Sequence, residues 1–174
     1  MTKRSSGKFK RNKGDFYVTP PSAVVPLIPH LPPGVTFDEP CAGDGALVDA
    51  LEQYDTMCVS MSDIDPKRND IEQCDAFDIN STLADCFITN PPWTREWLHP
   101  MIIHLSNIAP TFMLYDADWF HTRQASEFSE RCSDIISVGR ASWMGNGISG
   151  FDNASWYRFT VPVPGRHTKL HWRT

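Results

Sequence analysis

The segment FITNPPWTREW, residues 87–97, places an amide, two prolines and an indole directly after an apolar run. Proline has no backbone N–H to donate to a sheet, so Pro91 and Pro92 must end any strand that precedes them. The Asn90 side-chain oxygen and the proline carbonyls then offer acceptors for an amino group, and Trp93 offers a flat surface for a ring. Asn90, Pro91, Pro92 and Trp93 are therefore the candidate catalytic residues. A purely structural alternative is a proline-stiffened turn beside a core tryptophan.

A second candidate site is the glycine turn EPCAGDGAL at residues 39–47. Gly43 and Gly45 allow a sharp turn and let a ligand approach the main chain closely. The third glycine of the dinucleotide-binding fingerprint is missing, and the Glu39 carboxylate disfavours a pyrophosphate. The turn suits a ligand that presents hydrogen-bond donors or an ammonium group.

Two further acids stand at or after predicted strand ends, Asp63 in SDIDP and Asp75 in CDAF. An acid at the end of the second strand of an α/β fold can accept hydrogen bonds from ribose hydroxyls. Asp75 offers a carboxylate for an adenine amino group beside the apolar ring of Phe77. Each acid alone is more often a solvated loop residue, but with Glu39 they form a series. The series indicates a nucleoside with a positively charged tail, which makes S-adenosylmethionine the candidate cofactor.

Alternating strands and helices are expected to position these residues. Apolar runs that end on acids, prolines or glycines predict strands at 35–40, 56–66, 86–90, 111–116, 133–139 and 155–163. Apolar residues at helical spacing predict helices at 41–54 and 97–109, and a short or bent one within 18–31. The alternation predicts one α/β unit, a Rossmann-like mostly parallel central sheet flanked by helices.

The same periodicity predicts which helical residues face the core. In the helix at 41–54 these are Leu47, Val48, Leu51 and Tyr54, and in the helix at 97–109 they are Leu98, Met101, Ile102 and Leu105. Near the start of the chain, Thr19 is the expected N-cap and Pro20 the expected first helical residue. The side chain of Trp156 is expected to pack in the core.

Charge is distributed unevenly along the 174 residues. Residues 1–14 hold six Lys or Arg and no acid, and residues 166–174 hold three more, whereas all 21 acids lie in 15–165. We therefore expect a basic arm (1–14), one catalytic domain (15–165) and a basic tail (166–174). The ends are either solvated and disordered or hold a polyanion that the acidic body would repel.

Other features of the chain exclude several classes of protein. No apolar run approaches the roughly 18 residues of a membrane helix, and no apolar region follows the basic N-terminus as in a signal peptide. Five widely spaced cysteines without a Cys-x-x-Cys pair predict neither a disulfide framework nor a metal site. We expect a cytoplasmic protein, in a bacterial or phage-infected cell, with no membrane partner.

Four blocks of the chain resemble the amino-methyltransferases that use S-adenosylmethionine. They are DFYVTP (15–20), EPCAGDGAL (39–47), SDIDP (62–66) with CDAF (74–77), and NPPW (90–93). Their order is similar to that of the adenine-N6 DNA methyltransferases of phage and restriction systems, and implies their class I methyltransferase fold. Trp93 departs from the more usual Tyr or Phe, although its larger face should stack at least as well.

The resemblance also implies residue roles. The first block would form a wall at the methionine end of the cofactor, the glycine turn would lie against the methionine portion, Asp63 would bind the ribose and Asp75 the adenine. The full set of implied cofactor residues is Phe16, Tyr17, Thr19, Pro20, Glu39, Pro40, Ala42, Gly43, Gly45, Asp63, Ile64, Asp75, Ala76, Phe77 and Asn90.

The implied substrate is adenine in double-stranded DNA, flipped out of the helix and stacked on Trp93. Relatives in restriction systems carry a separate target-recognition domain, for which 174 residues leave no room. Recognition would then come from loops, a homodimer or a partner subunit, with Arg123, Arg140 and Trp143 as substrate contacts. RNA, a protein glutamine, or a non-catalytic role as a partner subunit are the alternatives.

Overall fold

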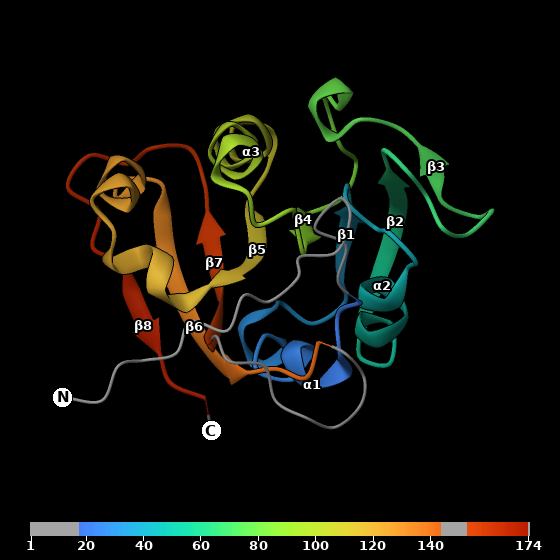
Figure 1. Ribbon diagram of the computed structural model, residues 1–174, viewed down its shortest axis with the longest axis horizontal. Helices are drawn as coiled ribbons and strands as arrows, with labels where there is room; N and C mark the ends of the chain where they lie inside the picture. The colour runs from blue at the N-terminus through green and yellow to red at the C-terminus, as the bar shows by residue number, and fades with distance from the viewer. Residues whose placement is uncertain (1–17, 144–152, 174) are drawn as a thin grey trace, which may run out of the picture.

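The computed structural model describes residues 18–143 and 153–173, and its centre is one eight-stranded sheet (Figure 1). The strand order is β3-β2-β1-β4-β5-β7-β6-β8. Strand β7 runs antiparallel to both its neighbours, and the other neighbouring pairs are parallel. The strands are β1 (Val35–Glu39), β2 (Thr56–Asp63), β3 (Glu72–Gln73), β4 (Cys86–Thr89), β5 (Thr111–Asp116), β6 (Cys132–Arg140), β7 (Asn153–Phe159) and β8 (Lys169–His171).

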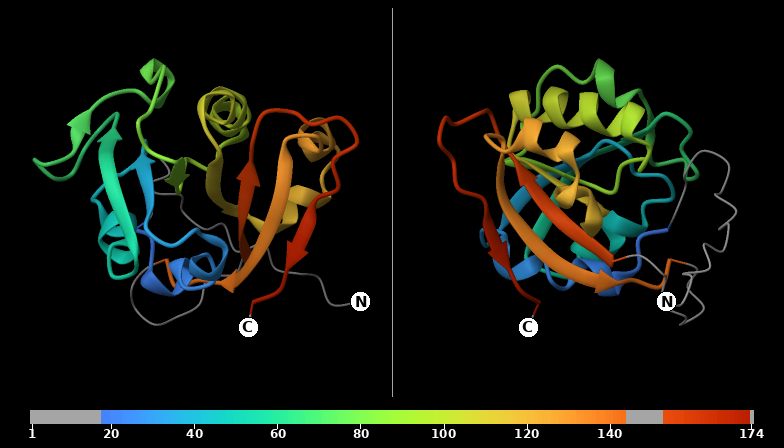
Figure 2. Two further views of the ribbon diagram at one scale, coloured as in Figure 1. Left: turned by 180° about the vertical axis from the view of Figure 1, so that it is seen from behind. Right: turned by 60° about the vertical axis from the view of Figure 1, so that its left-hand side comes forward.

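Helices cover both faces of this sheet (Figure 2). Helix α3 (Arg95–Ile108) lies on one face, and the shorter α1 (Pro21–Val24) and α2 (Ala46–Leu51) lie on the other. The connections include the 3-10 helices η2 (Ile28–His30), η3 (Ala76–Asp78), η4 (Ala117–His121) and η5 (Arg123–Phe128). The α/β architecture expected from the sequence is therefore confirmed.

The central strands contribute side chains to the hydrophobic cores on both faces of the sheet, because successive side chains of a strand point in opposite directions. In β5, Phe112 and Leu114 join the cluster under α1 and α2, whereas Met113 and Tyr115 join the cluster under α3. Trp156 of β7 is fully buried, and its indole N–H donates to the Ala23 carbonyl at 2.8 Å, across 133 residues of sequence. This contact ties the N-terminal segment to one of the last strands.

The strand order places the candidate residues at one edge of the sheet. Strand β1 lies between β2 and β4, and all three run parallel. Glu39 and Asp63 are the last residues of β1 and β2, and Asn90 directly follows β4. Parallel strands present their carboxyl ends at the same edge, and ligands bind there where the strand order reverses. In this sheet that reversal falls between β1 and β4.

Three local predictions were wrong, and two strands were not predicted. Thr19 is not the N-cap of α1, because its hydroxyl accepts a hydrogen bond from Asn90 instead. Pro20 stands at the N-cap position and is therefore not the first helical residue. Tyr54 is 41% exposed because α2 ends at Leu51, before the helical spacing can bring position 54 inward. The short strands β3 and β8 were missed, and β8 makes part of the basic tail an ordered neighbour of β6.

None of the helices in residues 18–143 and 153–173 is both long and apolar enough to cross a membrane.

Candidate active site

The Asn90 side chain is held at both ends of its amide. Its nitrogen donates to the Thr19 hydroxyl at 3.0 Å, and its oxygen accepts from the Trp93 indole N–H at 3.1 Å. An indole N–H can only donate, so the atom facing it must be the amide oxygen. The amide therefore has one allowed orientation, with the second lone pair of its oxygen still available.

The Trp93 ring is half-buried and contacts two other aromatic rings. It meets Tyr115 edge-on at 5.4 Å between centroids and Trp143 at 5.3 Å. The Tyr115 hydroxyl donates to the Trp93 backbone carbonyl at 2.9 Å, which fixes the loop after the two prolines. The predicted substrate residue Trp143 thus lies beside the predicted catalytic residue Trp93. Tyr115 was not predicted, because only the fold brings the end of β5 next to this loop.

Glu39 is a carboxyl group buried at the carboxyl end of β1. It is 1% exposed, and its Oε1 accepts from the Cys41 backbone N–H at 3.1 Å. Its Oε2 has no hydrogen-bond partner within the described part of the chain. Burial, with a contribution from the charge of Asp63, raises the pKa of Glu39 to about 8. A buried carboxyl with an unpaired oxygen is suited to receive a cation, which would favour its ionised form.

Cys41 lies beside this carboxyl but is chemically inert. Burial, with the Glu39 charge next, raises the pKa of its thiol far above neutrality. Its sulfur lies 3.8 Å from that of Met101. The thiol is protonated at neutral pH and is therefore no nucleophile.

The glycine turn is fixed to the end of β2 by hydrogen bonds. Gly43 has a φ of 56°, and its N–H donates to Asp63 Oδ2 at 2.8 Å. The other carboxylate oxygen of Asp63 accepts from the Asp65 N–H at 2.7 Å. Pro40 and Ala42 are buried within the turn, and Ile64 beside Asp63 is 66% exposed. Asp63 thus presents a carboxylate that is already aligned by the backbone on both sides.

Asp75 is connected to Asp63 through the main chain, since the Cys74 N–H donates to the Asp63 carbonyl at 3.0 Å. The Asp75 carboxylate caps η3 by accepting from the Phe77 N–H, also at 3.0 Å. Ala76 is buried, and the Phe77 ring is half-buried against His104. The three predicted acids therefore stand in order along one edge, with apolar groups beside the last.

Other predicted residues are less closely grouped. Arg123 begins η5 and Arg140 ends β6; both are exposed, and neither takes part in the hydrogen bonds of the Asn90 side chain. Thr19, Pro20 and Trp143 line a cavity of about 580 Å³ together with residues of α2. Glu39, Asp63 and Asp75 do not line that cavity. The predicted residues Phe16 and Tyr17 lie outside the described residues.

Comparison with known proteins gives similarity at the level of structure. No protein-family model matches the chain, and no curated protein does. A proposed RNA methyltransferase from Pyrococcus horikoshii shares 17% identity, with a TM-score of 0.63 over 89% of this chain and 93% of its own. A proposed class I S-adenosylmethionine-dependent methyltransferase from Listeria monocytogenes has a TM-score of 0.53 and 11% identity, over 87% and 62%.

The methyltransferase subunit of a type I restriction-modification system from Streptococcus thermophilus is also similar. Its TM-score is 0.54 at 11% identity, over 86% of this chain and 45% of its own. The chain has the class I methyltransferase fold. This confirms the predicted fold class, and at such identities the likeness is one of fold alone.

Within the class I fold, sequence reasoning found the residues that stand at strand ends and missed those that support them. Glu39, Asp63 and Asn90 carry a local signal, since each ends or follows an apolar run. Tyr115 contacts the loop that follows Asn90, and Arg68 contacts the glycine turn, but neither residue carries such a signal. Their partners are distant in sequence, and only the assembled class I sheet brings them together.

Proposed function

We propose that the protein transfers a methyl group from S-adenosylmethionine to the exocyclic N6 amino group of adenine in DNA. The observation that carries this proposal is the Asn90 amide, oriented by Thr19 and Trp93 directly after β4. Such a group offers a hydrogen-bond acceptor to an amino nitrogen beside an aromatic face. Its place at the switch point of a class I fold puts it at the usual ligand-binding edge.

The residues at this edge fit the proposed cofactor. The unpaired Oε2 of Glu39 suits the ammonium group of the methionine portion, and Gly43 and Gly45 let the main chain approach it. Asp63, aligned by two backbone N–H groups, can accept from ribose hydroxyls. Asp75 and the Phe77 ring suit the adenine. When bound, S-adenosylmethionine supplies a methyl group on positively charged sulfur.

The chain's own groups would prepare the amino nitrogen for attack. Its lone pair is delocalised into the adenine ring, so the free amino group is a poor nucleophile. The Asn90 oxygen and the Pro91 carbonyl can accept its two hydrogens, which draws the nitrogen towards tetrahedral geometry. These acceptors also stabilise the positive charge that grows on nitrogen as it bonds to the methyl carbon. One proton would then pass from nitrogen to solvent, with a neutral thioether left in place of the positively charged sulfur.

Trp93 and its neighbours would hold the base. An adenine inside a duplex is inaccessible, so it must be flipped out. Stacking on an aromatic side chain contributes about 1–3 kcal/mol per base in nucleic-acid complexes. Tyr115 fixes the Trp93 backbone, and Trp143 stands edge-on to its ring. Arg123 and Arg140 are the proposed phosphate contacts, so affinity should fall steeply with salt.

RNA is the second candidate substrate. The proposed RNA methyltransferase from Pyrococcus horikoshii is matched over 93% of its length. A single-stranded RNA would need no base to be extracted from a duplex. The site chemistry is the same for both nucleic acids.

The test is tritium transfer from labelled S-adenosylmethionine to unmodified double-stranded DNA, with RNA in parallel, followed by nucleoside analysis. N6-methyladenine in DNA would support the proposal. Label in RNA alone would replace DNA as the substrate. Cofactor binding without label in either would favour a protein substrate or a partner-dependent role.

A further inference from the structure

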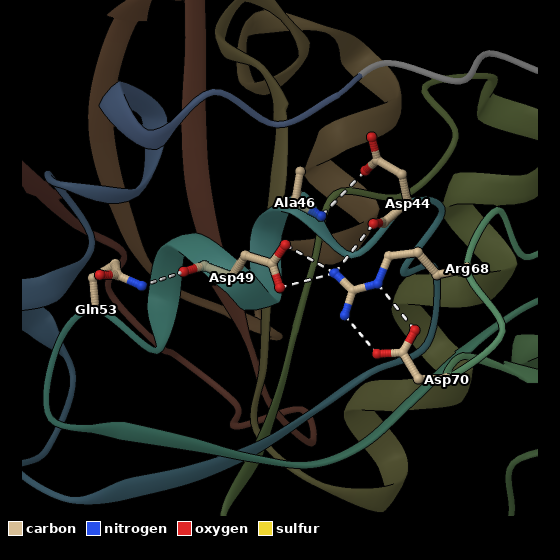
Figure 3. Close-up of polar contacts among 6 residues, drawn as sticks. All are labelled: Asp44, Ala46, Asp49, Gln53, Arg68 and Asp70. Atoms are coloured by element: carbon tan, nitrogen blue, oxygen red, sulfur yellow. Dashed lines mark hydrogen bonds and ion pairs between the residues drawn. The ribbon is translucent and has the colours of Figure 1, made fainter.

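Arg68 joins three parts of the chain around the glycine turn (Figure 3). Its Nη1 donates to both carboxylate oxygens of Asp49 at 2.8 Å and to the Asp44 carbonyl at 3.3 Å. Its Nε and Nη2 donate to the two oxygens of Asp70 at 3.0 and 2.6 Å. Asp49 belongs to α2 and Asp44 to the glycine turn, whereas Asp70 belongs to the same loop as Arg68. One guanidinium therefore connects this loop, the turn and the helix.

The same loop contacts the turn through the main chain. The Lys67 N–H donates to the Gly43 carbonyl at 2.8 Å, while the Gly43 N–H donates to Asp63. Both polar backbone groups of Gly43 are thus bound by the segment that begins at the end of β2. The position of the turn relative to Asp63 depends on this loop.

The Arg68 side chain also explains the glycine at position 45. Gly45 has a φ of 81°, and a Cβ placed there would lie 2.3 Å from Arg68 Nη1. The guanidinium lies directly against the backbone of the turn, on the side where any other residue would carry a side chain. Hydrogen bonds to the carboxylates of Asp49 and Asp70 restrict movement of the guanidinium away from the turn. The absence of a Cβ at Gly45 therefore leaves room for the guanidinium beside the turn, where the Arg68 side chain is 32% exposed.

Charge adds to the geometry. Hydrogen bonds to Asp70 and Asp49 raise the pKa of Arg68 further, and the same pairing lowers the pKa of Asp70. Without a cation at this point, the carboxylates of Asp49 and Asp70 would lose the charge that compensates both of them. Arg is suited to this place because its planar fork can pair with one carboxylate through two N–H groups and reach a second carboxylate through a third, a geometry that the compact ammonium of Lys does not offer.

We propose that Arg68 is a positioning residue for the cofactor: it holds the glycine turn against Asp63 in the geometry that binds S-adenosylmethionine. The role rests on the proposed function, since it presumes that cofactor. Arg68 acts through Gly43, Gly45 and α2 rather than by touching the ligand. Preorganisation of this kind raises affinity because the ligand does not have to order the loop on binding.

The experiment is isothermal titration of S-adenosylmethionine into the full chain and its variants, with melting curves to establish folding. Arg68→Ala should weaken binding about tenfold, and Arg68→Lys should recover only part of it. The control is Lys67→Ala, which removes the same charge from the adjacent residue. The Lys67 side chain pairs with Asp65 alone among the described residues, so its loss should leave affinity within about twofold.

Steady-state kinetics separates positioning from a general structural effect. Arg68→Ala should raise KM for the cofactor and leave kcat at saturating cofactor unchanged, because the Asn90 site is intact. If Arg68→Ala does not fold, Asp49→Asn serves instead, since it weakens the contact with α2 and keeps the pairing with Asp70. It should weaken binding about threefold.

The outcomes are distinct. Equal affinity of Arg68→Ala and the unmodified chain, or equal losses in Arg68→Ala and Lys67→Ala, would overturn the role. Full recovery by Arg68→Lys would also overturn it, since charge alone would then suffice. Failure of the unmodified chain to bind S-adenosylmethionine would instead reject the proposed cofactor and this role with it.

Discussion

Thr19 accepts a hydrogen bond from the Asn90 amide at 3.0 Å, although 71 residues separate them in sequence. Thr19, two residues before α1, thus fixes the side chain of the residue that follows β4. Its hydroxyl is buried with the Thr19 side chain, which is 5% exposed. The resemblance to amino-methyltransferases predicted Thr19 as part of a cofactor wall, whereas its contact in this structure is with the proposed catalytic amide.

Replacing the Thr19 hydroxyl should therefore slow transfer more than it weakens cofactor binding. Thr19→Val keeps the shape and removes the acceptor, so the amide is held through its oxygen alone. We expect kcat to fall about tenfold, with the affinity for S-adenosylmethionine within about twofold. Thr19→Ser retains a hydroxyl and is the control. A large loss of cofactor affinity with unchanged kcat would instead support the wall.

Removing the amide itself should separate catalysis from cofactor binding. Asn90→Ala loses the acceptor for the amino hydrogens, so we expect no measurable transfer. The cofactor should still bind, because Glu39, Asp63 and Asp75 are untouched. The measurement is calorimetric binding alongside tritium transfer. Full activity in this variant would show that the site is assigned to the wrong residue.

Trp93 offers a ring face and an indole N–H, and two substitutions separate them. Trp93→Phe keeps a ring but removes the donor to Asn90, so we expect kcat to fall several-fold with little change in the Kd for nucleic acid. Trp93→Ala also removes the stacking surface and should weaken nucleic-acid binding by about 1–3 kcal/mol. Fluorescence anisotropy and initial rates measure the two effects. Equal binding by both variants would contradict stacking on Trp93.

Asp63 is expected to control cofactor affinity. Asp63→Ala removes the proposed ribose acceptor and also the acceptor of the Gly43 and Asp65 N–H groups. We expect the Kd for S-adenosylmethionine to rise at least about tenfold, since hydrogen bonds to charged groups contribute roughly 1.5–3 kcal/mol. Asp65→Ala is the matched control, because the Asp65 side chain is exposed and pairs with Lys67. Equal effects of the two substitutions would contradict the assignment of Asp63 to the cofactor-binding site.

Glu39 should make stability depend on pH. Burial raises its pKa in the folded chain from 4.5 to about 8, so between these values the folded state binds a proton that the unfolded state does not. The contribution of Glu39 to the free energy of unfolding is therefore fully present below pH 4.5 and is lost as the pH rises through 8. Melting temperatures of Glu39→Gln and the unmodified chain should diverge from pH 5 to 9, with the variant favoured at high pH. Parallel curves would contradict the buried carboxyl.

The fold could be predicted wherever local chemistry and the final packing agree. Strand β4 is buried throughout and ends at Thr89, two residues before Pro91, and the inward residues of α3 are spaced for one helical face. Position 54 shows the limit of periodicity, because α2 ends before it. Strand β8 has only three residues, and its contacts with β6, including His171 to Asp134 at 2.9 Å, are far apart in sequence.

The candidate site divides in the same way. Residues that end strands have a sequence signature, since an apolar run must stop on a polar or proline residue at the edge of the sheet. Residues that orient them have none. Tyr115 reaches Trp93 from β5, and Arg68 reaches Asp49 across 19 residues. Such contacts depend on sheet order, which no short motif encodes.

The hydrogen bond from Trp156 to Ala23 bears on synthesis of the chain at the ribosome. Residues are made from the N-terminus onward, so the segment with Thr19 emerges well before its partner strand β7. A nascent chain that stops before β7 has Asn90 and the glycine turn but no indole to fasten Ala23, four residues from Thr19. Completion of the proposed active site is therefore tied to the synthesis of β7.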